Sequence, residues 1–136
     1  MKTFSIAFGG GISCTVQTPD QQPSANSRLI QNTVWRGPSV SNLPKAKRQK
    51  IWRTYVAWIN SINTQLANEW NTTILHVFLI GPDQCEPWEY VPGKPPRFLG
   101  RQKVPSPETL AKTSSPMGLI NHPDGQRPYG HLGKLE

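Results

Sequence analysis

The sequence predicts a small α+β protein: an N-terminal β-hairpin, one long amphipathic helix and a following buried strand form the core, and a Pro/Gly-rich extended arm follows. Three observations lead to this class. Apolar residues alternate near the N-terminus, recur at helical spacing after residue 44, and then form one continuous run. Prolines and glycines interrupt the chain after that run. We therefore expect a domain over 1–81 and an arm over 82–136.

The hairpin is predicted by two alternating segments, 2–8 and 12–18, on either side of three glycines. Glycine adopts positive φ without a Cβ penalty, which suits a tight turn. The alternative is a glycine loop that cradles phosphate, but such a loop needs a helix and a Lys-Ser/Thr pair directly after it. Neither follows, so the hairpin is favoured. Residues 18–42 read largely as loop, with RLIQNTVW (28–35) as a candidate short strand.

The helix is predicted to begin near Pro44, because proline suits the first helical position and no Pro or Gly follows until Gly81. At 100° per residue its apolar side chains share an arc of about 160°. The members of this arc are Ile51, Trp52, Tyr55, Val56, Trp58, Ile59, Ile62, Leu66 and Trp70. The side chains expected to face away are Arg53, Asn60, Ser61, Thr64 and Asn68.

The run ILHVFLIG, residues 74–81, has the length and β-rich composition of a central strand. Beyond it, ten of the fourteen prolines and seven of the eleven glycines lie in 81–136. We expect no helix or strand longer than a few residues there, apart from a helical turn at 107–113. The arm has too few apolar residues to offset its ordering entropy, so its composition predicts disorder. If the arm is ordered, the protein's own core or neighbouring chains must hold it.

All of the net charge of +7 comes from one part of the chain. Residues 21–68 contain seven Lys or Arg and no Asp or Glu, whereas the other eight basic residues are balanced by eight acidic ones. Such asymmetry favours phosphate polymers or acidic protein surfaces as partners.

Five basic residues occupy the first two turns of the expected helix: Lys45, Lys47, Arg48, Lys50 and Arg53. The macrodipole is already positive at this end, so cations there are locally unfavourable, but together with the free N–H groups they can bind an anion. Three interpretations stay open. The cluster contacts nucleic acid or another anion, docks on an acidic protein surface, or is a solvated helix start without a specific role.

A second stretch without acidic residues lies in the arm. Its cations are Lys94, Arg97, Arg101 and Lys103, interleaved with Tyr90 and Phe98. Aromatic residues among cations are typical of single-strand binders, in which bases stack while cations follow the backbone. A rigid extended arm, of the kind that ribosomal and viral structural proteins carry, is the other interpretation.

The tryptophans of the apolar arc, Trp52, Trp58 and Trp70, are candidates for core packing or subunit contact. The helix offers more apolar surface than a hairpin and one strand can cover. We therefore expect part of it, together with Tyr90 and Phe98, to contact another chain.

Metal binding and catalysis find little support. The possible metal ligands are Cys14, His76, Cys85, His122 and His131, and none form the close pairs typical of zinc sites. Cys85 with His76 could form a nucleophile and base, but the spacing of the two residues in the sequence does not support such a pair. The carboxylates near Cys85 are interpreted as an acidic loop. We expect no catalytic residue, metal or cofactor.

These observations predict a non-enzymatic structural subunit of a larger assembly of the virion, phage tail or connector, or ribonucleoprotein type. The alternative is a nucleic-acid-binding module that places its basic helix start on phosphates. Two cysteines are compatible with a reducing compartment, and the glycines break the apolar N-terminal stretch that a signal peptide would need. We expect a cytoplasmic protein, or part of a particle assembled there, without a membrane partner.

Overall fold

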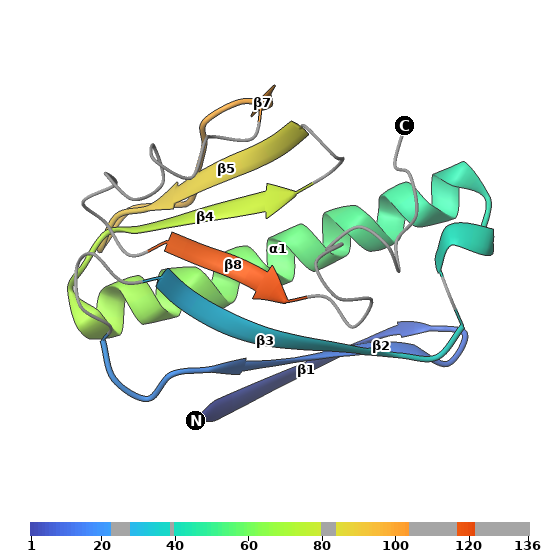
Figure 1. Cartoon of the computed structure of the whole chain (residues 1–136), viewed down its shortest axis with the longest axis horizontal. Helices are drawn as coiled ribbons and strands as arrows, with labels where there is room; N and C mark the ends of the chain where they lie inside the picture. The colour runs from blue at the N-terminus through green and yellow to red at the C-terminus, as the bar shows by residue number, and fades with distance from the viewer. Residues whose placement is uncertain (23–27, 39, 80–83, 104–116, 122–136) are drawn as a thin grey trace.

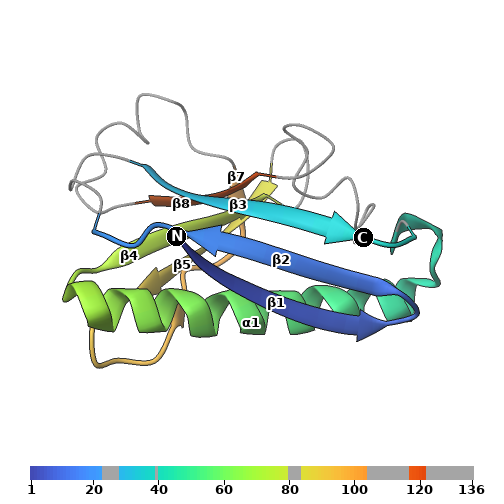
Figure 2. The same ribbon diagram turned by 90° about the horizontal axis from the view of Figure 1, so that it is seen from below.

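The computed structural model describes residues 1–22, 28–38, 40–79, 84–103 and 117–121. A single mixed sheet is covered on one face by a long helix (Figures 1 and 2). The sheet consists of β1 (Lys2–Gly9), β2 (Ile12–Thr18), β3 (Arg28–Arg36), β4 (Ile74–Leu79), β5 (Gln84–Tyr90), β6 (Arg97–Phe98), β7 (Gln102–Lys103) and β8 (Met117–Asn121). A short 3-10 helix (Val40–Asn42) leads into α1 (Lys45–Trp70). The predicted α+β class is confirmed.

The strands follow the order β1-β2-β3-β8-β4-β5-β6, and β7 pairs with β5 beside β6. Strands β1, β2 and β3 are antiparallel neighbours, as are β4 and β5. Strand β8 lies between β3 and β4 and is parallel to both. The sheet is thus two antiparallel units joined through β8 (Figure 1).

The predicted hairpin is confirmed, and its turn shows why glycines are present. Gly10 and Gly11 have φ of 63° and 79°, the pair of positive values that a two-residue hairpin turn with the right twist requires. Gly9 pairs with Ile12 and also has positive φ, next to an irregularity in the register at Ala7. The turn is therefore a hairpin tip rather than the start of a helix.

Helix α1 packs its apolar arc on the sheet, where aromatic rings meet. Trp35 on β3 lies 5.0 Å from Tyr55 and 5.4 Å from Phe8, measured between ring centroids. The helix begins one residue after Pro44 and ends at Asn71, whose left-handed conformation (φ 49°) directs its N–H to the last turn. Asn60, which was expected to face away, is instead buried, because its side-chain oxygen accepts a hydrogen bond from the Tyr90 hydroxyl.

The candidate strand at 28–35, within the stretch 18–42 that reads largely as loop, is confirmed, because β3 spans Arg28–Arg36. The expectation that no strand longer than a few residues follows Gly81 is wrong, because β5 spans seven residues. Pro87 fits in β5 because its carbonyl accepts a hydrogen bond from Leu99 at 3.0 Å. The backbone polar groups of Pro87 therefore face away from β4, so the N–H that proline lacks removes no hydrogen bond between β4 and β5.

The segment 84–103, assigned to the arm from sequence, thus lies at the sheet edge, and Met117–Asn121 forms the inner strand β8. The turn expected at 107–113 lies outside the described residues.

Candidate functional site

The basic helix start, defined as Lys45, Lys47, Arg48, Lys50 and Arg53, places five cations in the first turns of α1. All of these residues are exposed except Arg48, which is half-buried. The ion pairs among the described residues join the N-terminus to Asp20, Lys2 to Glu69, Arg97 to Glu89 and Arg101 to Glu86. Lys45, Lys47, Lys50 and Arg53 contribute to none of these four pairs.

The backbone at this end of α1 adds to the positive potential. Pro44 precedes the helix and provides no side-chain cap, and the first turn contains no acidic residue. The first α-helical bond runs from the Arg48 N–H to the Pro44 carbonyl at 3.1 Å. The N–H groups before Arg48 therefore remain available, and the positive end of the macrodipole adds to the side-chain charges.

The structure brings the tip of the β1–β2 hairpin to this end of α1 (Figure 2). Between them lies a cavity of about 460 Å³, here called the hairpin cavity. It is lined by Ala7, Phe8, Gly9, Gly10, Ile12, Pro38, Leu43, Lys47, Lys50, Ile51 and Thr54. Its walls are mainly apolar, two lysines supply the charge, and the part of the chain that the structure describes adds no carboxylate to the lining.

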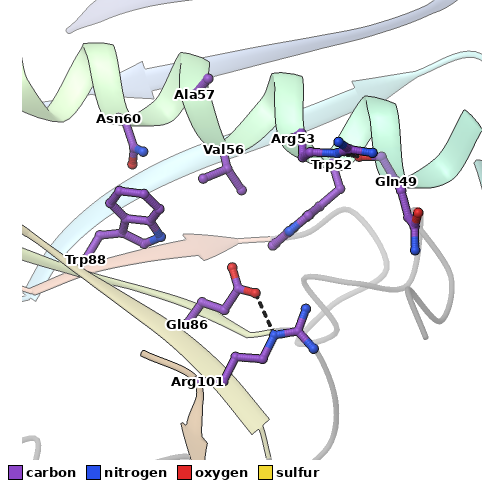
Figure 3. Close-up of a pocket in the computed structure, with 9 residues that line it drawn as sticks. All are labelled: Gln49, Trp52, Arg53, Val56, Ala57, Asn60, Glu86, Trp88 and Arg101. Carbon is purple, nitrogen blue, oxygen red and sulfur yellow. Dashed lines mark hydrogen bonds and ion pairs between the residues drawn. The ribbon is translucent and has the colours of Figure 1, made fainter. Parts of the chain in front are cut away.

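A second cavity of about 450 Å³, the Glu86 cavity, lies between α1 and β5 (Figure 3). It is lined by Gln49, Trp52, Arg53, Val56, Ala57, Asn60, Glu86, Trp88 and Arg101. The Glu86 carboxylate, with a side chain only 11% exposed, accepts a hydrogen bond from Arg101 Nε at 2.9 Å. The Trp88 Nε1 is buried and has no hydrogen-bond partner among the described residues. An internal carboxylate makes this cavity the less suitable of the two for an anion.

The second basic stretch does not form one cationic surface. Arg97 lies 3.5 Å from Glu89, and Arg101 is paired with Glu86. Tyr90 is only 1% exposed, so it cannot stack on a base or contact another chain. Phe98 is 46% exposed, with its ring 5.2 Å from that of Trp88. Lys94 and Lys103 are exposed and belong to none of the four ion pairs.

The tryptophans assigned to subunit contact are found on the core of their own chain. Trp52 is 9% exposed and meets Phe78 edge-on at 5.7 Å. Trp58 and Trp70 are partly buried against the same core. The sheet is wider than the hairpin and single strand expected from the sequence, and it covers most of the apolar arc. Contact of the partly buried Trp58 and Trp70 with another chain stays a prediction.

Cys85 and His76 do not come together as a nucleophile and base. The His76 Nδ1 lies 3.0 Å from the Asn63 amide on α1, whereas Cys85 pairs in register with Leu79 and points to the opposite face of the sheet. Burial lowers the pKa of His76 to about 3, and burial also raises the pKa of Cys85. Asp83, one of the carboxylates near Cys85 in the sequence, lies outside the described residues.

The two cysteines are free thiols, and burial raises the pKa of Cys14 to about 12. Within the described ranges, no group of three His, Cys, Asp or Glu residues is placed to hold a metal ion. His122 and His131 lie outside these ranges.

No helix in the part of the chain that the structure describes has the length and apolar character needed to cross a membrane.

The chain matches no protein-family model, no curated protein and no solved structure.

The sequence identified the basic helix start but not the hairpin cavity beside it. Gly9 and Lys47 are far apart in the chain, and no periodicity or motif connects them. The only signal in the sequence is the glycine run itself, and no helix follows it directly, as a phosphate-binding loop requires. In the folded protein a helix start does lie next to those glycines, but it comes from a distant segment.

Proposed function

We propose that this protein is a non-enzymatic nucleic-acid-binding module that places the basic helix start of α1 on phosphates. The observation that carries the proposal is the exposure of Lys45, Lys47, Lys50 and Arg53, with none of them in the ion pairs found among the described residues. Cations held without counter-charges at the positive end of a helix attract a polyanion from solution.

Cations at the start of α1 are unfavourable for the protein when no ligand is bound. A bound anion therefore explains their position better than solvation alone does. Acidic residues in the first turn of a helix stabilise it by about 0.3–1 kcal/mol each, and α1 has cations there instead. A bound phosphate would reverse this unfavourable term. Lys45 and Arg53, the first and last of these cations, lie about 12 Å apart along the helix axis, so the cluster is long enough to meet more than one phosphate of a nucleic-acid strand.

Charge reversal tests the proposal directly. Binding of a labelled oligonucleotide, followed by fluorescence anisotropy, should weaken steeply with salt in proportion to the number of phosphates neutralised. The double variant Lys47→Glu and Lys50→Glu should lower the affinity by about a hundredfold or more at 100 mM salt, since two attractive contacts become repulsive. Acidic residues near the start of α1 should not weaken the helix, so lost binding would not reflect unfolding.

The matched control is the double variant Lys94→Glu and Lys103→Glu. Both lysines are exposed and belong to the second basic stretch, so this variant has the same net charge as the first. It should retain most of the affinity. Equal losses in the two variants would mean that net charge alone drives binding, and the helix start would have no special role.

An acidic protein surface remains the competing partner for the same cations. It predicts that nucleic acid binds weakly to the wild type, and that the double variant at Lys47 and Lys50 loses a protein partner instead.

The edge strand β1 favours a second candidate function, that of a structural subunit of an assembly. Strand β1 pairs with β2 alone and leaves its outer backbone groups without a strand neighbour among the described residues. It contains no proline, and its one charged side chain, Lys2, contacts Glu69 at 2.5 Å. Up to the irregularity at Ala7, β1 is a regular edge, and such edges without proline or free charge are the ones that pair with other chains.

A further inference from the structure

The hairpin cavity combines apolar walls with cations, and this combination specifies the ligand more closely than charge alone. We infer that the cavity takes one unstacked base of a single-stranded nucleic acid, while Lys47 and Lys50 hold the phosphates on either side of that base. The inference rests on the proposed function and names the form of nucleic acid that the site prefers.

The walls suit a planar aromatic ring. Phe8 is half-buried, with its ring stacked on that of Trp35 at an interplanar angle of 16°, and it lines the cavity together with Ile12, Leu43 and Ile51. Aromatic and aliphatic side chains of this kind stack on bases without regard to sequence. The volume of about 460 Å³ is within the range of about 300–1,000 Å³ found for small-molecule sites.

The polar groups suit the phosphates of the same nucleotide chain. Lys47 and Lys50 lie one turn apart on α1 and are both exposed, so their ammonium groups can reach phosphates outside the apolar part. Among the described residues, no carboxylate lines this cavity, whereas the other cavity contains Glu86. Of the two cavities, the hairpin cavity alone has the charge pattern of a nucleotide site.

The hairpin tip leaves the cavity open to an extended strand. An ideal Cβ built at Gly9 or Gly10 meets no atom within 4 Å, so this side of the entrance has free space. A base within a duplex is stacked and paired, and it would have to be extruded before it could enter. Single strands do not require that step, which predicts a preference for single-stranded over double-stranded ligands.

Thr54 provides a way to block the cavity without touching the charges. It lines the cavity from an exposed position on α1, and its hydroxyl only donates back to the Lys50 carbonyl at 2.9 Å. Thr54→Trp fills the cavity with an indole. Ser61→Trp is the matched control, because Ser61 is an exposed residue on the same helix that lines neither cavity and makes a similar backbone contact, at 2.7 Å to the Trp58 carbonyl.

The test compares a labelled thymidine oligonucleotide with a duplex of the same length, by anisotropy at fixed salt. The wild type should bind the single strand more tightly than the duplex. Thr54→Trp should weaken single-strand binding about tenfold, the factor expected for the loss of one stacked base, and leave duplex binding unchanged. Ser61→Trp should change neither. If Thr54→Trp fails to fold by circular dichroism, Thr54→Met provides a smaller filler for the same comparison.

The contrary results separate this inference from the proposed function. Equal binding of both ligands by the wild type, with no effect of Thr54→Trp, would overturn the base site and leave phosphate binding by the helix start intact. Failure of the wild type to bind either ligand would overturn both proposals. Thymidine monophosphate offers the same chemistry as a free nucleotide, and full competition by it at micromolar concentration would overturn the assignment to a strand.

Discussion

Gly37 is the residue with the least room for a side chain among the glycines with positive φ that the structure describes. Its φ is 101°, and an ideal Cβ at this position would lie 2.2 Å from the Gly11 carbonyl oxygen. The neighbour is backbone in the hairpin turn, so it cannot rotate away. Gly37 therefore fixes the connection from β3 to the helix against the hairpin tip.

This close approach makes Gly37→Ala strongly destabilising. We expect a loss of about 2–4 kcal/mol in the free energy of unfolding, from the steric clash and the positive φ together. Gly93→Ala is the control, because Gly93 has a φ of 77° but no atom within 4 Å of an ideal Cβ. It should cost only about 1 kcal/mol. Urea denaturation measures both, and similar losses would show that crowding at Gly37 is not important.

His76 should make stability depend on pH. The residue is fully buried, its pKa is lowered from 6.5 to about 3 by burial, and its Nε2 has no hydrogen-bond partner among the described residues. Below pH 6.5 the unfolded chain binds a proton that the folded chain does not. The free energy of unfolding should therefore fall as the pH decreases, by up to about 1.4 kcal/mol per pH unit, until the folded pKa is reached.

The window between pH 6.5 and 4.5 isolates this effect. The pKa of Glu69 is lowered from 4.5 by its hydrogen bond with Lys2, so that carboxylate affects stability only at lower pH. His76→Gln keeps a neutral polar side chain and removes the titration. Urea denaturation across the window should give a shallower pH dependence for the variant, and equal slopes would exclude His76 as the source.

At the scale of the elements, hydrophobic periodicity predicted the strands and helices whose apolar side chains share one face of a single segment. The alternation of Phe4, Ile6 and Phe8 predicted β1, and the helical arc predicted α1 with its buried side chains. Asn60 was misplaced because helical spacing describes only the helix, whereas the hydrogen bond that allows its burial comes from Tyr90 on a distant strand. Partners supplied by tertiary structure are not visible in local sequence.

The strands after Gly81 were missed for a related reason. Dense prolines predict the absence of strands, yet Pro87 occupies β5 at a position where an N–H would face away from β4. The register of a strand decides toward which neighbouring strand the backbone of a proline points. That register is set by strand pairing. The same limitation applies to the candidate site: its five cations were found from sequence, whereas the hairpin cavity depends on tertiary contacts.

At the scale of the whole molecule, the edge formed by β1 is the feature most relevant to assembly. Phe4, Ile6 and Phe8 are only half-buried against the core, although they share the face that α1 covers. A neighbouring chain paired along β1 would extend the sheet and shield these side chains further. The second candidate function depends on whether such pairing occurs in solution.

Lysines on the exposed positions of β1 should prevent that pairing. We expect the wild type to form dimers or larger species and the double variant Thr3→Lys and Ser5→Lys to be monomeric, because charges on an edge strand oppose strand addition. Gln17→Lys is the control, since Gln17 is exposed on β2, which already has neighbours on both sides. Light scattering over a range of concentrations measures the mass, and a wild type that stays monomeric would contradict the assembly role.

The central position of β8 has a consequence for how the chain folds during synthesis. The β1–β3 unit, α1 and the β4–β5 pair are all complete in the nascent chain before residues 117–121 have been made. Until then β3 and β4 lack the strand that lies between them, and a gap of about 10 Å, two strand spacings, separates their hydrogen-bonding edges. Closing the sheet therefore requires the late insertion of a parallel strand, a non-local step of the kind that slows folding. During that interval two inner strands have unpaired edges that other nascent chains could occupy.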